Sequence, residues 1–289
     1  MHFKQNRIRL FVFFIFILLL IQACSKREEI SDDDYFGTKV MILGHRGMGE
    51  MYRFPGNTLQ AIMPALAIGT DGCEVDVQIT KDTVLVLYHN LLLDSRTTCS
   101  GRVYESNWAE LQQCQYNAIQ NGIYVNSVDS VFRKIPGLTN LYFSFDCTKV
   151  DTAIDDQDHY RGQLLRAIQR ICEKYHMCNN VFLEGYGDLL DKAQSLGMTN
   201  KLFIFGNLDE NTINFAAERH YCGVSTSIDA LNVDTELAHQ KGLYVMTWSP
   251  DNYAENKKAL RRNVDIIQTD DPISILKLLK RYNYEYIIP

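Results

Sequence analysis

From residue 40 onward, short apolar runs alternate with stretches in which apolar residues recur at helical spacing. The apolar runs predict eight strands: Val40–Gly44, Gly72–Gln78, Leu141–Cys147, Val181–Glu184, Lys201–Phe205, Cys222–Ser225, Leu243–Trp248 and Val264–Gln268. The helical patterns lie near 58–68, 127–134, 160–176, 187–196, 210–220, 233–241, 252–262 and 272–282. This alternation predicts a closed parallel (β/α)8 barrel, the TIM barrel of the α/β class. An open doubly wound sheet is the alternative, but no glycine-rich phosphate loop opens the first helix.

A predicted β-hairpin interrupts the alternation after the second strand. Residues 80–83 are too few for the crossover that joins parallel strands, so residues 75–79 and 84–88 are predicted to pair antiparallel. A loop of two or four residues would place Glu74 opposite His89 on the same face. A loop of three residues would move His89 to the other face. The chemistry described below favours the first register.

The first helix is predicted to begin at Asn57, whose side chain can cap it with Gln60 as the partner three residues on. Pro64 lies inside this helix and is expected to kink it, because proline removes a backbone donor. The segment of about 90–126, which follows the hairpin, is predicted to be a small insertion over the barrel mouth.

The amino-terminal segment is predicted to be a lipoprotein signal. Three basic residues precede an apolar run over residues 10–21, which is short for a membrane-spanning helix. The run ends in Ile-Gln-Ala-Cys at Cys24, which is similar to a bacterial lipobox, so that residues 1–23 would be removed and Cys24 would carry lipid. An uncleaved anchor is the alternative. Both place the catalytic part outside the cytoplasm, tethered to a bacterial membrane on its periplasmic or outer-membrane face.

The rest of the chain divides into a polar tether over 24–38 and one domain over 39–289. The domain has about the 250 residues of a single TIM barrel. Lysine and arginine number 29 against 35 acidic residues, a net charge of −6 that argues against a nucleic-acid partner.

The chain has eight cysteines, and if Cys24 carries lipid, the odd number left implies at least one free thiol. Three lie in strand-like runs and are interpreted as small core residues: Cys73, Cys147 and Cys222. The remaining four can form short-range disulfides, Cys99–Cys114 and Cys172–Cys178, in an oxidising compartment. The alternative is that all are reduced and buried.

Polar residues lie at or just after the ends of several predicted strands. In a TIM barrel the carboxyl ends of the strands gather at one rim, which holds the active site. These residues are His45, Arg46, Asp146, Glu184, Trp248, Thr269 and Asp270.

Glu74 and Asp76 are two residues apart on a strand, so their side chains share a face. The two carboxylates would repel each other unless they are protonated or bridged by a cation. Asp146 can supply a third carboxylate, and three of them suit Ca²⁺ or Mg²⁺ better than zinc. A solvated strand face is the alternative for an isolated pair, but this strand is otherwise apolar.

Two histidines are placed to transfer protons beside these carboxylates. His45 and His89 are the candidate general acid and base. Arg46 can bind a phosphodiester oxygen through its two-pronged donor geometry, and the metal would offset the negative charge that develops on phosphorus-bound oxygens. The set predicts metal-assisted cleavage of a phosphodiester.

The ordered set resembles the glycerophosphodiester phosphodiesterase family over nearly all of 40–275. The matching motifs are His45-Arg46-Gly47, Asn57-Thr58, Gly69-x-Asp71-x-x-Glu74-x-Asp76-Val77, Thr80-Lys81-Asp82, His89 and Val264 to Pro272. The resemblance implies a TIM barrel, catalytic roles for His45 and His89, and one divalent cation on Glu74, Asp76 and Asp146. It also implies cleavage of glycerophosphodiesters to glycerol 3-phosphate and an alcohol, through a cyclic phosphate that water opens.

Three positions depart from the family pattern. Gly56 stands where the family usually has glutamate, and Asn90 where it has aspartate. Asp146 replaces a glutamate that usually has a lysine two residues on, whereas here Lys149 comes one place later. These departures leave substrate choice and rate open.

Small water-soluble glycerophosphodiesters are the expected substrates, with the leaving alcohol pointing toward Trp248 and the insertion. One alternative is a phosphodiesterase that cleaves intact lipids, of the sphingomyelinase D or phosphoinositide lipase type. The other is a catalytically silent lipoprotein that binds phosphodiester headgroups.

Overall fold

The computed structural model describes residues 39–49, 53–118, 120–231 and 235–283. The predictions for the signal segment, Cys24 and the tether lie outside these residues. None of the helices in the described part of the chain is long and apolar enough to span a membrane.

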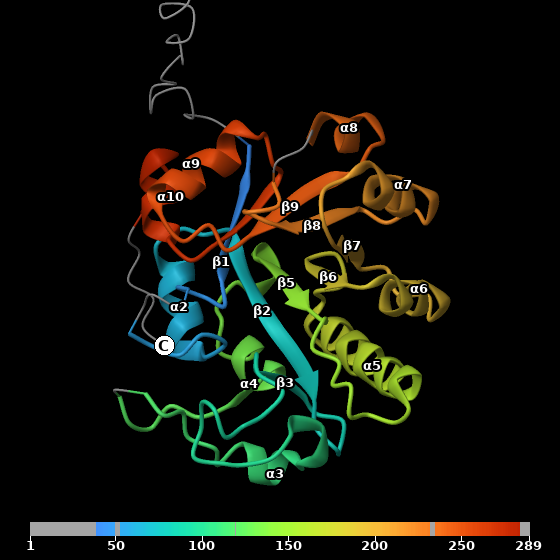
Figure 1. Cartoon of the computed structure of the whole chain (residues 1–289). Helices are drawn as coiled ribbons and strands as arrows, with labels where there is room; N and C mark the ends of the chain where they lie inside the picture. The colour runs from blue at the N-terminus through green and yellow to red at the C-terminus, as the bar shows by residue number, and fades with distance from the viewer. Residues whose placement is uncertain (1–38, 50–52, 119, 232–234, 284–289) are drawn as a thin grey trace, which may run out of the picture. The chain divides into compact units, whose positions relative to one another are not determined.

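Eight parallel strands close into a barrel, so the predicted TIM fold is confirmed (Figure 1). Around the barrel the strand order is β1-β10-β9-β8-β7-β6-β5-β2, and β2 pairs with β1 to close it. The strands are β1 (Met41–His45), β2 (Gly72–Ile79), β5 (Tyr142–Asp146), β6 (Val181–Gly185), β7 (Lys201–Phe205), β8 (Gly223–Ser227), β9 (Tyr244–Trp248) and β10 (Ile266–Thr269).

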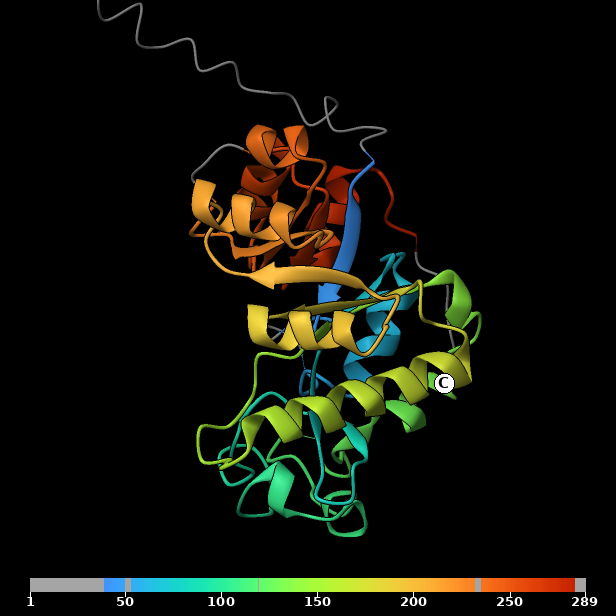
Figure 2. The ribbon, with the colours of Figure 1, turned by 90° about the vertical axis from the view of Figure 1, so that its right-hand side faces the viewer.

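Helices cover the outside of the barrel (Figures 1 and 2). They are α2 (Leu59–Ala67), α4 (Val128–Phe132), α5 (Gln157–Tyr175), α6 (Gly187–Ser195), α7 (Glu210–Glu218), α8 (Thr235–Gln240), α9 (Tyr253–Arg261) and α10 (Pro272–Leu278). The longest, α5, begins where the Asp156 side chain accepts the His159 amide and ends at His176 in the left-handed region. Its buried positions recur every three or four residues, which is the pattern of a helix that packs one face on a sheet.

The start of α2 differs from the prediction. Thr58, not Asn57, caps this helix, because the Thr58 hydroxyl accepts the Ala61 amide. Pro64 lies inside the helix, which continues to Ala67. Asn57 is released from capping and takes another role at the site.

Side chains from five strands meet inside the barrel, where they form a buried apolar cluster. Its members are Leu43, Phe182, Phe203, Met246 and Ile266. A polar group also lies inside, where Glu184 accepts hydrogen bonds from Ser144, Ser225 and Gln268. Glu184 is therefore held by three partners from β5, β8 and β10.

The predicted hairpin exists, but its predicted register is wrong. β2 pairs with β3 (Leu85–Leu87) so that Val77 faces Leu87 and Ile79 faces Leu85. The loop therefore has five residues, an odd number, so Tyr88 lies opposite Asp76 and His89 does not lie opposite Glu74 as predicted. His89 still approaches the site because β3 ends two residues before it.

The predicted insertion packs on a core of its own. It contains the 3₁₀ helix η2 (Val103–Glu105) and α3 (Trp108–Leu111), and it ends at β4 (Asn126–Ser127), which pairs with β3. The core includes Tyr88, Leu93, Leu111 and Tyr116.

The Cys99–Cys114 disulfide predicted within the insertion is present. The Cys172–Cys178 pairing is wrong, because both thiols are free. Cys73 and Cys147 are buried as predicted, whereas Cys222 is half-buried at the start of β8.

Candidate active site

Three carboxylates converge at the carboxyl ends of two neighbouring strands. Glu74 and Asp76 lie on β2, and Asp76 pairs in register with Asp146 on β5. One oxygen from each residue lies within 4.8 Å of the others. The predicted convergence of these three acids is therefore what the structure contains.

Burial and mutual repulsion give the cluster unusual acidities. Burial, followed by the nearby Asp76 charge, raises the pKa of Glu74 well above its ordinary value and also raises the pKa of Asp146. Burial alone would raise the pKa of Asp76 as well, but the charges of Arg46 and His89 outweigh it and lower that pKa. A cation among these oxygens would offset the repulsion.

The donor set fits a hard divalent cation. All three side chains offer oxygen, which is the ligand type of Ca²⁺ and Mg²⁺ sites. Neighbouring groups fix two of them: the Asn57 amide donates to Asp76 Oδ2 at 2.7 Å, and the Arg46 backbone amide donates to Glu74 Oε2 at 3.0 Å. Sequence reasoning missed this role of Asn57, whose backbone lies in the left-handed region at φ 64°.

A tight turn after β1 presents His45 and Arg46 to the carboxylates. Gly47 has φ 97°, and a Cβ there would lie 2.6 Å from the Ala61 carbonyl oxygen, so only glycine fits. Arg46 Nε lies 3.1 Å from Asp76 Oδ2. The turn therefore places a guanidinium directly beside the predicted metal ligands.

His45 is buried and faces carboxylates on both sides. Its Nδ1 lies 2.9 Å from Asp270 Oδ1, and its Nε2 lies 3.6 Å from Glu74 Oε2. The Ser249 hydroxyl is 3.4 Å from the same Nδ1. Asp270 was predicted at the rim, but its role in orienting His45 was missed because the two residues are 225 positions apart.

His89 lies on the other side of the cluster and is more exposed. Its Nε2 is 4.0 Å from Asp76 Oδ1, and its side chain is 36% exposed. Its Nδ1 lies 2.7 Å from Asn90 Oδ1, and the Asn90 amide donates to Ser95 Oγ. The asparagine that replaces the family's aspartate therefore still orients the ring, with a neutral acceptor.

Lys149 also faces the cluster, with Nζ 3.6 Å from Asp146 Oδ2. In the family pattern a lysine lies two residues after the third acid, whereas here Lys149 lies three residues after Asp146. The one-residue offset therefore keeps a cation at this carboxylate.

Trp248 belongs to a different part of the mouth. Its ring stacks on Phe205 with centroids 5.4 Å apart, and Phe205 contacts Tyr186 edge-on at 5.7 Å. The buried indole nitrogen has no hydrogen-bond partner among the described residues. These aromatic residues come from β7, β9 and the segment after β6.

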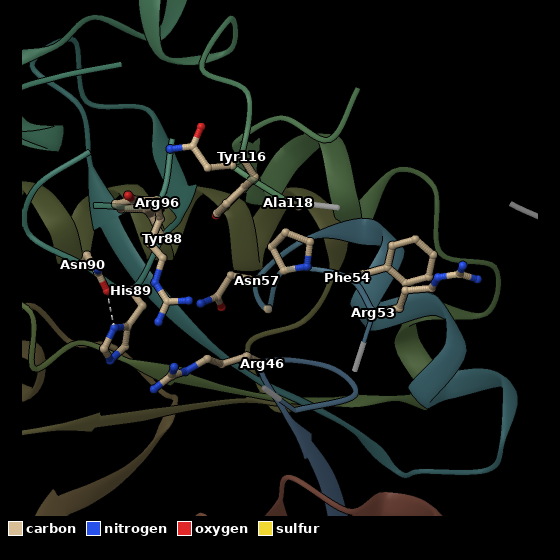
Figure 3. Close-up of a pocket in the computed structure, with 13 residues that line it drawn as sticks. Arg46, Arg53, Phe54, Asn57, Tyr88, His89, Asn90, Arg96, Tyr116 and Ala118 are labelled. Carbon is tan, nitrogen blue, oxygen red and sulfur yellow. Dashed lines mark hydrogen bonds between the residues drawn. The ribbon is translucent and has the colours of Figure 1, made fainter. Parts of the chain in front are cut away.

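A pocket of about 290 Å³ opens beside Arg46 and His89, between the turn after β1 and the insertion (Figure 3). Its lining residues are Arg46, Arg53, Phe54, Pro55, Gly56, Asn57, Tyr88, His89, Asn90, Arg96, Tyr116, Asn117 and Ala118. Trp248 is not one of them, so the structure separates the two features that were expected to receive the leaving alcohol together. Sequence reasoning did not single out Arg53 or Arg96.

Comparison with known proteins gives a consistent result. The chain matches the Glycerophosphoryl diester phosphodiesterase family over residues 45–274. A curated protein of Caldanaerobacter subterraneus subsp. tengcongensis, named glycerophosphodiester phosphodiesterase, is 23% identical over 258 residues, which are 84% of this chain and 99% of that protein.

Solved structures share the fold. A glycerophosphodiester phosphodiesterase from Parabacteroides distasonis has a TM-score of 0.71 at 19% identity, covering 84% of this chain and 97% of that one. An Oleispira antarctica phosphodiesterase, solved with the product sn-glycerol-3-phosphate, has a TM-score of 0.69 at 15% identity, covering 83% and 96%.

Proposed function

Because the chain belongs to the glycerophosphoryl diester phosphodiesterase family, we propose that it hydrolyses small, water-soluble glycerophosphodiesters to glycerol 3-phosphate and an alcohol at this site. The observation that carries the proposal is the convergence of His45, His89 and the three carboxylates of β2 and β5 around one point. Cleavage of glycerophosphodiesters is the activity of the family. The metal and the roles of the residues are the finer part of the proposal.

Glu74, Asp76 and Asp146 would hold one divalent cation, Ca²⁺ or Mg²⁺. When bound, the cation supplies positive charge to the phosphoryl oxygens. Arg46 is close enough to the cluster to bind another oxygen of the same phosphodiester, since its Nε already lies 3.1 Å from Asp76.

The two histidines have different partners, and these suit different roles. His45 can donate Nδ1–H to Asp270, which leaves Nε2 as the unprotonated nitrogen toward the site, so His45 suits the general base. His89 can donate Nδ1–H to the Asn90 amide oxygen and lines the pocket with its ring, where a second proton on Nε2 can be given to a leaving alcohol. His89 therefore suits the general acid.

In the first step His45 takes the proton of a glycerol hydroxyl of the substrate as that oxygen bonds to phosphorus. The bond from phosphorus to the leaving alcohol breaks, and the alcohol departs with a proton from His89. Water then adds to phosphorus and opens the cyclic phosphate, with the proton transfers reversed.

The decisive test measures glycerol 3-phosphate release from glycerophosphocholine after exhaustive chelation and after Ca²⁺ or Mg²⁺ is restored. Chelation should abolish release and either metal should restore it. Full activity without metal would overturn the metal-dependent mechanism. Faster cleavage of lysolipid or sphingomyelin would favour the lipid-cleaving alternative, and no cleavage of any of these substrates would favour a binding protein.

We further propose that the mature chain is anchored outside the cytoplasm by lipid on Cys24. The support is the apolar run that ends in Ile-Gln-Ala-Cys. The wild type should partition with membranes, whereas Cys24→Ala should release soluble protein or leave residues 1–23 attached. Unlipidated wild-type protein in the cytoplasm would contradict this anchoring.

A further inference from the structure

The pocket beside His89 is basic, although the chain as a whole carries a net charge of −6. The described residues of its lining include three arginines, Arg46, Arg53 and Arg96, and no aspartate or glutamate. One of the three, Arg46, is paired with Asp76 and serves the scissile phosphate in the proposed reaction. Arg53 and Arg96 are two further guanidinium groups in this lining.

The arginines are distributed along the pocket. Figure 3 shows the side chains of Arg46, Arg96 and His89 turned toward one region, while Arg53 and Phe54 lie at the other end. Arg96 is supplied by the insertion, in the segment that also holds Asn90 against His89. A leaving group that extends from the scissile phosphate past His89 would therefore meet a second and a third guanidinium.

The aromatic residues of the pocket do not make it a cage for a quaternary ammonium group. Tyr88 and Tyr116 are almost completely buried and contribute to the core of the insertion, with ring centroids 6.0 Å apart. Phe54, the third aromatic residue of the lining, is half-buried and packs against the same core. Arg53 and Arg96 are exposed, so charge dominates the accessible surface. A choline cation would be repelled there, because like charges at short range cost more than a cation–π contact returns.

We infer that the pocket selects glycerophosphodiesters whose leaving alcohol carries an anionic group of its own, a phosphate or a carboxylate. This inference rests on the proposed function and names its substrate class. Guanidinium groups bind phosphate and carboxylate oxygens through paired donors, and the volume of about 290 Å³ suits a headgroup rather than an acyl chain.

Two matched substrate pairs test the inference. Glycerophosphoinositol 4-phosphate differs from glycerophosphoinositol by one phosphate, and glycerophosphoserine differs from glycerophosphoethanolamine by one carboxylate. The anionic member of at least one pair should have a kcat/KM about tenfold higher at low salt, because charge-assisted hydrogen bonds are of this strength. The preference should shrink as ionic strength rises.

Variants show whether the arginines cause the preference. Arg96→Gln should reduce the ratio within the preferred pair by about tenfold, and Arg96→Lys should restore part of it because the charge is kept. Arg261→Gln, on an exposed residue of α9 outside the pocket, is the matched control and should leave the ratio unchanged.

Three results would overturn the inference. The first is equal kcat/KM within both pairs for the wild type, and the second is a ratio that Arg96→Gln does not change. The third is an equal loss for all four substrates in Arg96→Gln, which would assign Arg96 to the scissile phosphate common to all. If none of the four substrates is cleaved, the proposed function fails instead. The dissociation constants of the same four compounds, measured by calorimetry for the wild type and Arg96→Gln, then test the inference about the pocket through the same ratios.

Discussion

The two histidines of the site stand in opposite surroundings. His45 is 7% exposed, lies on β1 and is oriented by the carboxylate of Asp270, which follows the neighbouring strand β10. His89 follows the short strand β3, has a side chain that is 36% exposed and is oriented by the amide of Asn90 in the insertion. The barrel thus fixes one half of the site, while His89 in the other half is oriented from the insertion, which also supplies Arg96.

The difference shows which part of the site can be substituted with less effect on the barrel. A change near Asp270 would disturb paired strands of a closed sheet, whereas a change near Asn90 alters a loop that packs on a separate core. Two of the three departures from the family pattern, at Gly56 and Asn90, fall in the lining of the pocket.

Asp76 belongs to both halves, since it contacts Arg46 on one side and faces His89 on the other. Asp76→Asn should therefore produce the largest loss, at least about 10³-fold in kcat, because several kcal/mol of charge stabilisation disappear. Steady-state release of glycerol 3-phosphate measures it. An activity within tenfold of wild type would show that the cation is not held here.

His45→Ala and His89→Ala should each lower kcat by about 10²–10⁴-fold, the usual range for a lost general acid or base. Added imidazole should restore more activity to His89→Ala than to His45→Ala, because only the His89 position is open to solvent. Circular dichroism checks that both variants fold. Equal rescue of both would remove the contrast between the two surroundings.

Loss of the residue that orients the buried His45 should lower activity more than a change at the residue that orients the exposed His89. Asp270→Asn should reduce kcat/KM by about 10–100-fold, the typical effect of a lost orienting carboxylate. Asn90→Asp keeps an oxygen on His89 Nδ1 and should change kcat/KM by no more than about threefold. A larger effect at Asn90 than at Asp270 would reverse the assignment of the fixed and variable halves.

Breaking the disulfide should have the smallest effect on the barrel. The Cys99→Ala, Cys114→Ala double variant removes a link across 15 residues, worth up to about 3 kcal/mol. Limited proteolysis should then cut within 90–126 sooner, and KM should rise a few-fold with kcat little changed. Cys178→Ala, which removes a half-buried free thiol, is the control. Earlier cutting in the barrel strands would contradict the independence of the insertion.

The barrel was predictable because parallel strands are buried on both faces and so appear as continuous apolar runs. The three metal-ligand candidates were predictable because Glu74 and Asp76 interrupt one such run and Asp146 ends another. The hairpin register was not, since it depends on a loop in which Thr80 Oγ1 bonds Asp82 and Thr83 takes φ 62°.

Residues that act through long-range contacts were harder to predict. Asp270 meets His45 only when the barrel closes, and Arg96 reaches the pocket only through the fold of the insertion. Asn57 carried a signal, because it precedes a helix, but a cap and a ligand-orienting amide have the same sequence signature.

The entry and exit of the insertion are adjacent, because Val86 on β3 pairs with Ser127 on β4. A segment whose two ends meet on paired strands can be exchanged as a unit without altering the spacing of the barrel strands. Transplanting 90–126 between relatives therefore tests the proposed link between the insertion and headgroup choice while Glu74, Asp76 and His45 stay in place.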